Sequence, residues 1–302
     1  MDFSKGAAWM KGDIIPIEDA KIGVTDWGLT RSDITYDVVS VWDGAFFRLE
    51  DYLTRFEASM ASMRLDVGMN RAEIKAALTD MAAASGLRHA YCAMVASRGA
   101  PLIPGTRDPR HCGNHFYGWI VPYIHVIPKD VAERGASLWI GKNVHRIPDD
   151  SVNPRAKNYH WGDFTQALFQ AKDEGFDTAA MLDHAGNVTE GPGFNIFAMK
   201  DGRLITSDHG VLEGITRRTV MEIAAEQGME TDIRPLPLAE FLEADEVFLA
   251  TTAGGITPVR RVDDRVFSND APGPVTVGLC DAFDAFRQRP DHLTPIPFPD
   301  GD

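Results

Sequence analysis

Lys157 lies in the segment with the most chemical information, Asn153-Pro-Arg-Ala-Lys-Asn-Tyr-His-Trp-Gly-Asp163. The residues around it are of mixed polarity and precede a predicted helix, and partial loss of water there would activate an amine as a nucleophile. A single lysine is usually a solvated surface charge. A catalytic interpretation of Lys157 therefore depends on other residues further along the chain.

Glu190 is the second candidate, within Val188-Thr-Glu-Gly-Pro-Gly-Phe-Asn-Ile-Phe197. This pattern predicts the end of a strand, a glycine turn and another strand. The glycines allow the backbone to approach a ligand closely, with the carboxylate beside it. A tight hairpin with an exposed acid explains the same segment equally well.

Two further segments suggest an anion site. Gly214, Ile215 and Thr216 begin a predicted helix, so two backbone N–H groups and a hydroxyl could bind a phosphate. Thr216 could instead simply cap the helix. The turn Thr251-Thr-Ala-Gly-Gly255 follows a predicted buried strand and adds hydroxyl groups, although by itself it indicates only a loop.

An amine, a carboxylate and a phosphate cradle are together what pyridoxal 5'-phosphate requires. From about Ile14 to Phe286 the chain resembles the class IV, fold-type IV aminotransferases, and among them most closely the (R)-selective amine transaminases. The resemblance is densest in six segments: Asp33–Gly44, Arg55–Met60, Lys157–Asp163, Thr189–Asn195, Gly210–Arg217 and Thr251–Gly255.

The resemblance implies a role for each matching residue. Lys157 would be the Schiff-base lysine and proton shuttle, and Glu190 would pair with the pyridine nitrogen. The resemblance also implies a homodimer in which part of the loop 99–114 acts in the partner's site. The remaining cofactor contacts would come from Arg55, Gly214, Ile215, Thr216, Thr251 and Thr252, and the substrate pockets from Tyr36, Val38, Tyr91, Ala93, Trp161 and Ala253.

The chain departs from the amine transaminases in the mobile loop, where Pro104 replaces the arginine that binds the keto acid's carboxylate. Our hypothesis is that Arg31 supplies this guanidinium fork, with Arg107 or Arg110 as second choice; a surface role for Arg31 is the alternative. Ala93 replaces a larger acidic residue and would enlarge the pocket.

The leading prediction is thus transfer of an amino group from an (R)-amine or D-amino acid to a keto acid such as pyruvate. D-Amino-acid transaminase is the nearest rival. Branched-chain L-aminotransferase and aminodeoxychorismate lyase of the same fold follow, and a pyridoxal phosphate-binding protein without turnover ranks last.

Other features limit the possible partners. A formal net charge of −14 over 302 residues disfavours nucleic acid and anionic membranes. Cys92, Cys112 and Cys280 have no paired spacing, and no apolar segment has the length of a signal peptide or membrane span, so we expect a soluble cytoplasmic protein. We interpret His111-Cys-Gly-Asn-His115 as a loop without metal. His160 is interpreted as a residue that packs against or supports the catalytic segment rather than as a base.

These residues require elements to position them. Period-two runs around Asp43-Gly44 predict a hairpin over 36–47, and apolar spacing predicts a helix over 49–63. A capping pair at Asn70 and Glu73 begins a second helix that ends at Gly86. Further predictions are strands at 90–97, 116–126, 179–182 and 246–250, a hairpin over 194–206, helices at 163–174 and from 214, and a loosely packed tail from 287.

The overall prediction is an α/β protein of two domains. A small α+β domain spans 1–125, a linker 126–136, and a larger, β-barrel-like α/β domain 137–302. We expect the cofactor in the cleft between them.

Overall fold

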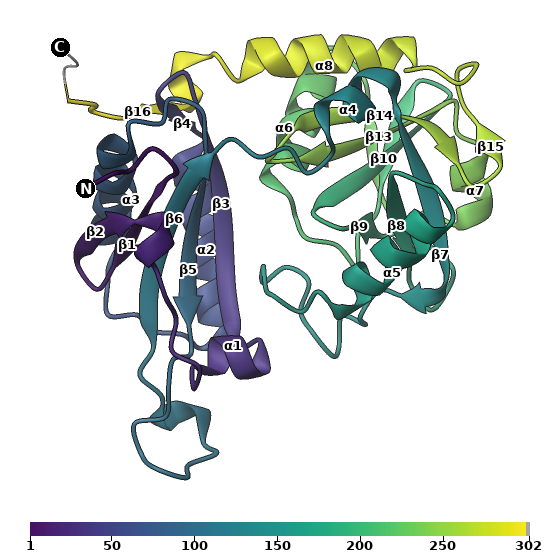
Figure 1. The fold of residues 1–302 in the computed structure, drawn as a ribbon. Coiled ribbons are helices and arrows are strands. Elements are labelled where there is room, and N and C mark those ends of the chain that lie inside the picture. Colours follow the sequence, from purple (N-terminus) through teal and green to yellow (C-terminus); the bar gives the residue numbers. More distant parts are fainter. Residues whose placement is uncertain (300–302) are drawn as a thin grey trace. The chain divides into compact units, whose positions relative to one another are not determined.

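The computed structural model describes residues 1–299, which divide into two units, each with its own sheet (Figure 1). Unit 1 comprises Met1–Ile124, Ala156–Tyr159 and the tail from Arg289, and unit 2 comprises His125–Arg155 and His160–Gln288. The division is therefore not consecutive along the chain, because a short segment around residue 157 and the tail both return to unit 1.

The predicted linker 126–136 differs from the structure. It contains helix α4 (Lys129–Arg134), and Ile127 and Val131 are buried in the apolar core of unit 2. The predicted second domain, 137–302, likewise includes a tail that belongs to unit 1, and residues 300–302 lie outside the described part of the chain.

Unit 1 is built on a seven-stranded sheet of order β16-β4-β3-β5-β6-β1-β2. Helices α2 and α3 cover one face of it, α2 against β3 and α3 against β1 and β6. The elements of unit 1 are β1 (Ala7–Met10), β2 (Asp13–Pro16), α1 (Trp27–Arg31), β3 (Ile34–Trp42), β4 (Ala45–Phe47), α2 (Leu49–Met63), α3 (Arg71–Ser85), β5 (Ala90–Ser97), β6 (His115–Pro122), β16 (Leu293–Pro295) and the 3-10 turns Ile17–Asp19, Pro109–His111 and Pro290–His292.

Local sequence signals explain these elements. Asp43 and Gly44 both have positive φ, 49° and 80°, as the tight hairpin between β3 and β4 requires. The predicted capping box is present at α3, where Asn70 and Glu73 bond each other's backbone, and Gly86 ends the helix with φ 68°. The predicted hairpin and both helices are confirmed.

Unit 2 is built on a nine-stranded sheet with the path β12-β11-β10-β13-β14-β7-β8. Strand β15 pairs with β14, and β9 pairs with β10. The elements of unit 2 besides α4 are β7 (Ala136–His145), α5 (Gly162–Asp173), β8 (Thr178–Leu182), β9 (Glu190–Gly191), β10 (Phe194–Lys200), β11 (Arg203–Thr206), α6 (Ile215–Glu226), β12 (Thr231–Ile233), α7 (Leu238–Leu242), β13 (Glu246–Thr251), β14 (Gly255–Val262), β15 (Arg265–Val266) and α8 (Pro274–Phe286).

Residues 188–191 close part of this sheet into a ring of paired strands. Val188 forms a bridge with Leu182 of β8, the Thr189 N–H donates to the Met181 carbonyl at 2.9 Å, and β9 then pairs with β10. The ring β10-β13-β14-β7-β8 thereby returns to β10, as the predicted barrel-like architecture requires. Glu190 lies in this closing segment.

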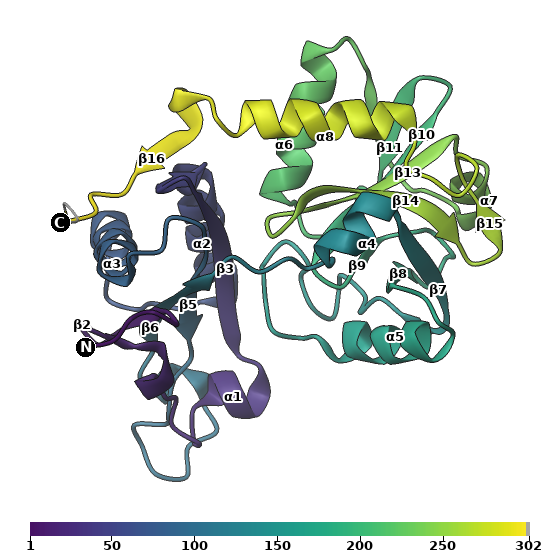
Figure 2. The ribbon, with the colours of Figure 1, turned by 45° about the horizontal axis from the view of Figure 1, so that its top comes forward.

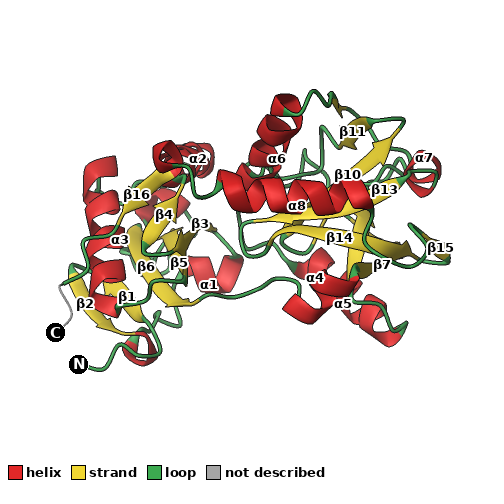
Figure 3. Cartoon of the chain, turned by 90° about the horizontal axis from the view of Figure 1, so that it is seen from above, coloured by secondary structure: helices red, strands yellow, loops and turns green. Residues whose placement is uncertain are grey.

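Helices α6 and α8 pack against each other, and α8 runs along β13 and β14 (Figures 2 and 3). The sequence analysis missed α8, β14 and β7. It was also wrong about the tail, because β16 pairs with β4 and Ile296 is buried. Within residues 1–299, no helix combines the length and the apolar character that crossing a membrane requires.

Candidate active site

Lys157 is held on the edge of β3 in unit 1. Strand β4 pairs only with residues 41 and 42 of β3, so the edge of β3 at its first residues is available to another segment. Residues 156–159 occupy it: Asn158 bridges Thr35, and the Lys157 carbonyl accepts from the Tyr36 N–H at 3.1 Å and the Thr35 hydroxyl at 2.6 Å. The Lys157 N–H donates to Oγ of Ser59 at 3.3 Å. The lysine backbone is therefore fixed to both the sheet and α2.

The Lys157 side chain is half-buried and lies over an aromatic ring. Its Nζ is 4.6 Å from the centroid of Tyr36, whose ring packs on Tyr159 at 4.3 Å. An ammonium over a ring face is attracted by the ring quadrupole. The tyrosines thus restrict where the amine can lie.

The face of the sheet that contains Tyr36 is uncharged across its three central strands. Directly paired residues of antiparallel strands share a face, and along this face no residue is a lysine, arginine, aspartate or glutamate. Its residues are Ile34, Tyr36, Val38 and Ser40 of β3, Tyr91, Ala93, Val95 and Ser97 of β5, and His115, Tyr117, Trp119 and Val121 of β6. Four residues predicted to shape the substrate pockets, Tyr36, Val38, Tyr91 and Ala93, therefore lie together.

Tyrosine hydroxyls supply the polarity of this face. Burial, together with the other tyrosines, raises the pKa of Tyr91, Tyr117 and Tyr159. These hydroxyls remain protonated and can donate hydrogen bonds to a carboxylate or a keto oxygen.

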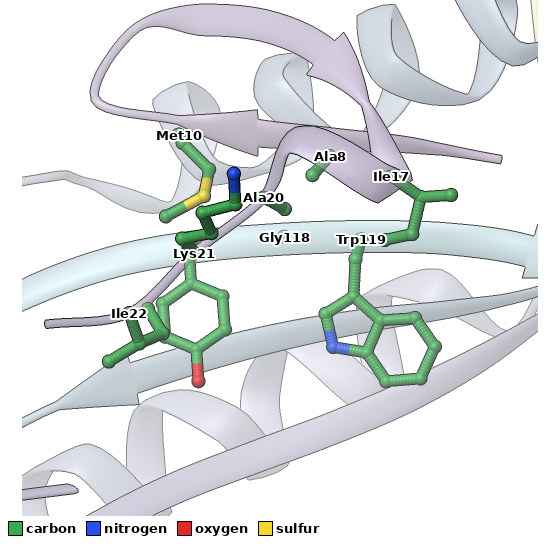
Figure 4. Close-up of a pocket in the computed structure, with 9 residues that line it drawn as sticks. Ala8, Met10, Ile17, Ala20, Lys21, Ile22, Gly118 and Trp119 are labelled. Atoms are coloured by element: carbon green, nitrogen blue, oxygen red, sulfur yellow. The ribbon is translucent and has the colours of Figure 1, made fainter. Parts of the chain in front are cut away.

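At one side of this face a cavity of about 220 Å³ lies beside Tyr117 and Trp119. Ala8 and Met10 of β1 complete it together with Ile17, Ala20, Lys21 and Ile22. Figure 4 shows Lys21 and Ile22 beside the strand that carries Gly118 and Trp119. Trp119 also stacks on Tyr91, with 5.4 Å between ring centroids. The cavity therefore adjoins the tyrosine-lined face.

Arg55, a predicted phosphate ligand, comes from α2 and pairs with a buried aspartate. Its Nε and Nη2 donate to Asp37 at 2.8 and 2.7 Å. Burial alone would lower the pKa of Arg55, but the Asp37 carboxylate raises it, so the guanidinium stays charged. The fork is thus held in one orientation.

Glu190 is buried in unit 2, with only 5% of its surface exposed. Its Oε2 accepts from the Leu212 N–H at 2.9 Å and from Nδ2 of Asn195 at 3.3 Å, and its Oε1 accepts from Arg146. An exposed hairpin acid is therefore excluded. The sequence predicts that the glycines here let a ligand approach the backbone. At Gly191 the requirement is internal packing, because a Cβ there would lie 2.5 Å from the Ala179 carbonyl oxygen.

The N-terminus of α6 has the form of an anion site. Gly214 precedes the helix, Ile215 and Thr216 are its first residues, both buried, and no side chain caps it. Helix α8 differs, because the Glu246 carboxylate accepts from the N–H groups of its first turn. The idea that Thr216 is only a cap is wrong. The backbone N–H groups of Ile215 and Thr216 at this helix start suit a phosphate.

Gly214 leaves no room for a side chain. A Cβ there would lie 2.1 Å from Oδ1 of Asn195, whose Nδ2 donates to the Leu212 carbonyl at 2.8 Å as well as to Glu190. Asn195 therefore connects Glu190 to the start of α6. One side chain thus contacts both a buried carboxylate and a helix start that could bind a phosphate, two of the groups that pyridoxal phosphate requires.

The remaining predicted residues of unit 2 have mixed placements. The Thr251 hydroxyl donates to the Gly193 carbonyl at 2.8 Å, and Ala253 is buried with its carbonyl bonded to the Val126 N–H. Thr252 is half-buried. Trp161 packs edge-on against Phe164 at 5.4 Å.

The predicted carboxylate-binding arginines lie elsewhere in unit 1. Arg31 is at the exposed end of α1, its guanidinium 3.2 Å from the centroid of Trp27, and Arg110 pairs with Asp108. Arg107 and Pro104 are exposed. The structure does not bring these side chains to the tyrosine-lined face, and the role proposed for Arg31 stays a prediction.

The histidines of the loop have other partners. His111 contacts the Thr106 hydroxyl, and Nε2 of His115 bonds Asp26 at 2.7 Å. Among residues 1–299 no group of His, Cys, Asp and Glu side chains could hold a metal ion.

Sequence reasoning missed four charged or polar residues of the site: Asp37, Arg146, Asp163 and Asn195. Asp37 had a signal, since it is the one charged residue of the strand Ile34–Trp42. Arg146 and Asp163 had none, because their pairing depends on how β7 and α5 pack.

Comparisons with known proteins identify the family of this chain. The family model described as "Amino-transferase class IV" matches residues 35–262. The chain is 33% identical to the "Putative branched-chain-amino-acid aminotransferase" of Methanocaldococcus jannaschii over 93% of this chain and 96% of that protein. It is 27% identical to the branched-chain-amino-acid aminotransferase of Escherichia coli K12, with 91% of each chain covered.

Solved structures show the same relationship. The branched-chain amino acid aminotransferase of Escherichia coli superposes with a TM-score of 0.89 at 25% identity, over 97% of this chain and 99% of that one. A branched-chain amino acid aminotransferase from Thermobaculum terrenum, in its pyridoxal phosphate form, superposes with a TM-score of 0.84 at 28% identity, over 98% of this chain and 99% of that one. The α/β fold with two sheets is thus the fold-type IV architecture. The chain belongs to the class IV aminotransferase family and is an aminotransferase.

Proposed function

We propose that this aminotransferase moves an amino group from a donor with an apolar substituent to a keto acid such as pyruvate. The observation that carries the proposal is the uncharged, tyrosine-lined face beside Lys157. Burial on such a face stabilises an apolar substituent by about 25 cal/mol per Å². The three strands of this face contribute no lysine or arginine that would bind a second carboxylate in the donor's side chain.

Pyridoxal 5'-phosphate is the cofactor of this family. When bound, it supplies the electron sink that makes a proton on the donor carbon acidic. In our proposal Lys157 attaches the cofactor and then carries that proton as the general base. Glu190 keeps the ring nitrogen protonated, and the phosphate is held by Gly214, Ile215, Thr216, Thr251, Thr252 and Arg55.

The tyrosines orient the substrate in this proposal. Tyr91 and Tyr159 keep their protons because their pKa values are raised, so they donate to the keto acid's carboxylate without carrying charge themselves. In this proposal the tyrosine hydroxyls bind the acceptor's carboxylate in place of the mobile-loop arginine, whose position is occupied by Pro104 in this chain. Val38 and Ala93 leave space for the substituent.

Two donor classes fit this face. The resemblance of the motifs at 33–44 and 157–163 to the (R)-selective amine transaminases favours (R)-amines, with D-amino acids next. The relatives compared above are named branched-chain aminotransferases. Their names favour L-leucine, L-isoleucine and L-valine as the second class of donors. Both classes have apolar substituents.

A donor screen with pyruvate and 2-oxoglutarate as acceptors separates these classes. The donors are (R)- and (S)-1-phenylethylamine, D- and L-alanine, and D- and L-leucine, with Lys157→Ala as the inactive control. Turnover of the (R)-amine or D-amino acids supports the first class. Turnover confined to L-leucine would establish the second and contradict the first, and turnover confined to charged donors would contradict the proposal as a whole.

We further propose a homodimer whose partner contributes to the site. Unit 1 exposes large apolar side chains around α1 and in the loop 99–114, namely Val24, Leu29, Leu102 and Ile103. Exposed apolar residues gathered in this way mark contact surfaces. Light scattering should give twice the chain mass, and Leu102→Asp should shift the population toward monomer; a wild-type monomer would contradict the proposal.

A further inference from the structure

The loop 99–114 between β5 and β6 has backbone pairing of its own. The Leu102 N–H donates to the His111 carbonyl at 2.8 Å, and the Gly113 N–H donates to the Ala100 carbonyl at 3.0 Å. Figure 1 shows the loop extending beyond the sheet of unit 1, below β5 and β6. The loop is therefore a paired arm, and its direction is set where it joins the two strands.

One buried carboxylate bonds both strand ends that carry this arm. Oδ1 of Asp26 accepts from the Ser97 hydroxyl at 2.5 Å, and Oδ2 of Asp26 bonds Nε2 of His115 at 2.7 Å. Ser97 is the last residue of β5, His115 is the first of β6, and the two pair directly. Asp26 precedes α1, whose Gly28 N–H donates to Oδ1 of Asp26 at 2.7 Å. We refer to Asp26, Ser97 and His115 as the loop clamp.

The carboxylate of Asp26 stays charged although only 4% of the residue is exposed. Burial alone would raise the pKa of Asp26, but the bonds from Ser97, His115 and the Gly28 N–H lower it. Because an ionised carboxylate can only accept, Nε2 of His115 carries the hydrogen of their bond. Hydrogen bonds to a charged group are shorter and stronger than neutral ones. The loop clamp therefore holds both strand ends to the start of α1.

Glycines show how closely these segments meet. A Cβ at Gly28 would lie 2.2 Å from Oγ of Ser97, and a Cβ at Gly99 would lie 1.8 Å from the Gly113 carbonyl oxygen. The Trp27 N–H donates to the Gly99 carbonyl at 3.1 Å. The start of α1 and the two ends of the loop are thus packed backbone to backbone, so loss of the clamp changes the direction of the loop.

We propose that the loop clamp positions the loop 99–114 for substrate binding in the partner subunit of the homodimer. This inference rests on the proposed function, in which part of this loop acts in the partner's site. A loop released from Asp26 would have its productive direction in only a fraction of the molecules, and the apparent affinity for substrate falls by that fraction. The three residues of the loop clamp are positioning residues, because they act through the loop.

Two replacements of His115 test the loop clamp in the holoenzyme. His115→Leu removes the donor to Asp26 and should raise the KM for pyruvate about tenfold, as expected for the loss of a bond to a charged group, while kcat and cofactor retention stay near wild type. His115→Gln keeps an N–H donor and should keep KM near wild type. His89→Leu is the matched control, since it removes an exposed histidine that pairs with Asp43 at 3.2 Å near the other end of β5.

Hybrid dimers show which subunit's site the loop serves. A His115→Leu chain is combined with a Lys157→Ala chain, and the hybrid is purified through two affinity tags. Its one site with a lysine receives the loop of the Lys157→Ala chain, in which the loop clamp is intact, so we expect the wild-type KM. A raised KM in this hybrid, or an unchanged KM in the His115→Leu homodimer, would overturn the inference.

A second hybrid separates this inference from the function beneath it. It combines Lys157→Ala with a chain in which two glycines replace residues 103–108, whose own homodimer should have a raised KM. If this hybrid has the wild-type KM while the His115→Leu hybrid does not, the loop acts in the partner's site and the role of the loop clamp is wrong. If neither hybrid has it, the loop does not act in the partner's site. If His115→Leu does not fold, as judged by thermal unfolding, Ser97→Ala is measured in the same way.

Discussion

Gly214→Ala tests whether Asn195 connects Glu190 to the phosphate cradle. The backbone at Gly214 has φ −63° and ψ 138°, which alanine adopts without strain, so only space is at issue. The new Cβ would lie 2.1 Å from Oδ1 of Asn195, whereas ordinary contacts begin at about 3.5 Å. Asn195 would have to move by more than about 1 Å, and its bonds to Leu212 and Glu190 would break.

The energetic cost follows from those two bonds. A neutral hydrogen bond contributes about 0.5–1.5 kcal/mol and one to a charged group about 1.5–3 kcal/mol, so Gly214→Ala should destabilise unit 2 by about 2–4 kcal/mol. For a unit of this size that lowers Tm by about 5 °C or more. Differential scanning calorimetry of the apoprotein measures the stability, and equilibrium dialysis measures the affinity for pyridoxal phosphate, which should also fall.

A double-mutant cycle isolates the contact. Asn195→Ala removes the obstructing atom, so Gly214→Ala should cost much less in that background than in wild type. Gly23→Ala, at a position with open space around it and without a positive φ, is a control for a glycine replacement away from the site. Wild-type Tm and cofactor affinity in Gly214→Ala, or strictly additive costs in the cycle, would refute the reasoning.

Four other predictions follow from the same structure. Lys157→Ala should release pyridoxal phosphate on dialysis yet leave Tm of the apoprotein near wild type, because the bonds from this residue to β3 and α2 are made by its backbone; a visible absorption band that survives dialysis would contradict this. Asp37→Ala should cost about 3–5 kcal/mol in denaturant unfolding, since it leaves the buried Arg55 charge without its carboxylate; a change below about 1 kcal/mol would show that Arg55 is otherwise compensated. Burial alone would lower the pKa of His209, but its bonds to Asp208 and Asp183 raise it. The protonated His209 therefore stabilises the fold fully at a pH below the ordinary histidine pKa, and this stabilisation is lost as the pH rises through the raised pKa. His209→Gln should lower Tm at pH about 5.5 and hardly change it at pH about 8.5, and equal losses of Tm at the two pH values would contradict the ion pairs. Arg31→Ala should raise the KM for pyruvate if Arg31 binds the carboxylate of pyruvate. An unchanged KM would contradict that role and would limit Arg31 to its stacking on Trp27.

The parts of the fold that the sequence predicts are those with local causes. The hairpin at Asp43-Gly44 and the capping box at Asn70 and Glu73 depend on residues within a few positions of each other. Helix α8 was missed although Pro274 at its start is a common signal, because its cap, Glu246, comes from a distant strand. The tail likewise depends on the pairing of β16 with β4, which no local pattern indicates.

The site divides in the same way. Lys157, Glu190 and the start of α6 belong to motifs in which chemistry and spacing coincide, so the sequence alone predicts a role for them. The electrostatic setting does not follow from spacing, because Arg146 and Asp163 are 17 residues apart and meet only where β7 and α5 pack. The sequence therefore predicts which groups act on the cofactor, but it does not predict the buried ion pairs around them.

The topology explains why Lys157 belongs to unit 1 although the chain on both sides of it belongs to unit 2. A lysine on a free loop would lose conformational entropy each time it reacted. Here the three-residue β4 leaves the edge of β3 open, and residues 156–159 pair with it. Thr35, Tyr36 and Ser59 therefore hold the Lys157 backbone, while its side chain lies above the Tyr36 ring. Thr35→Val tests this argument, because it removes the hydroxyl donor to the Lys157 carbonyl but keeps the strand. It should slow proton transfer, seen as a lower kcat with a larger primary isotope effect from a donor deuterated at its reacting carbon, without loss of cofactor; an unchanged isotope effect and kcat would show that pairing along β3 positions the lysine unaided.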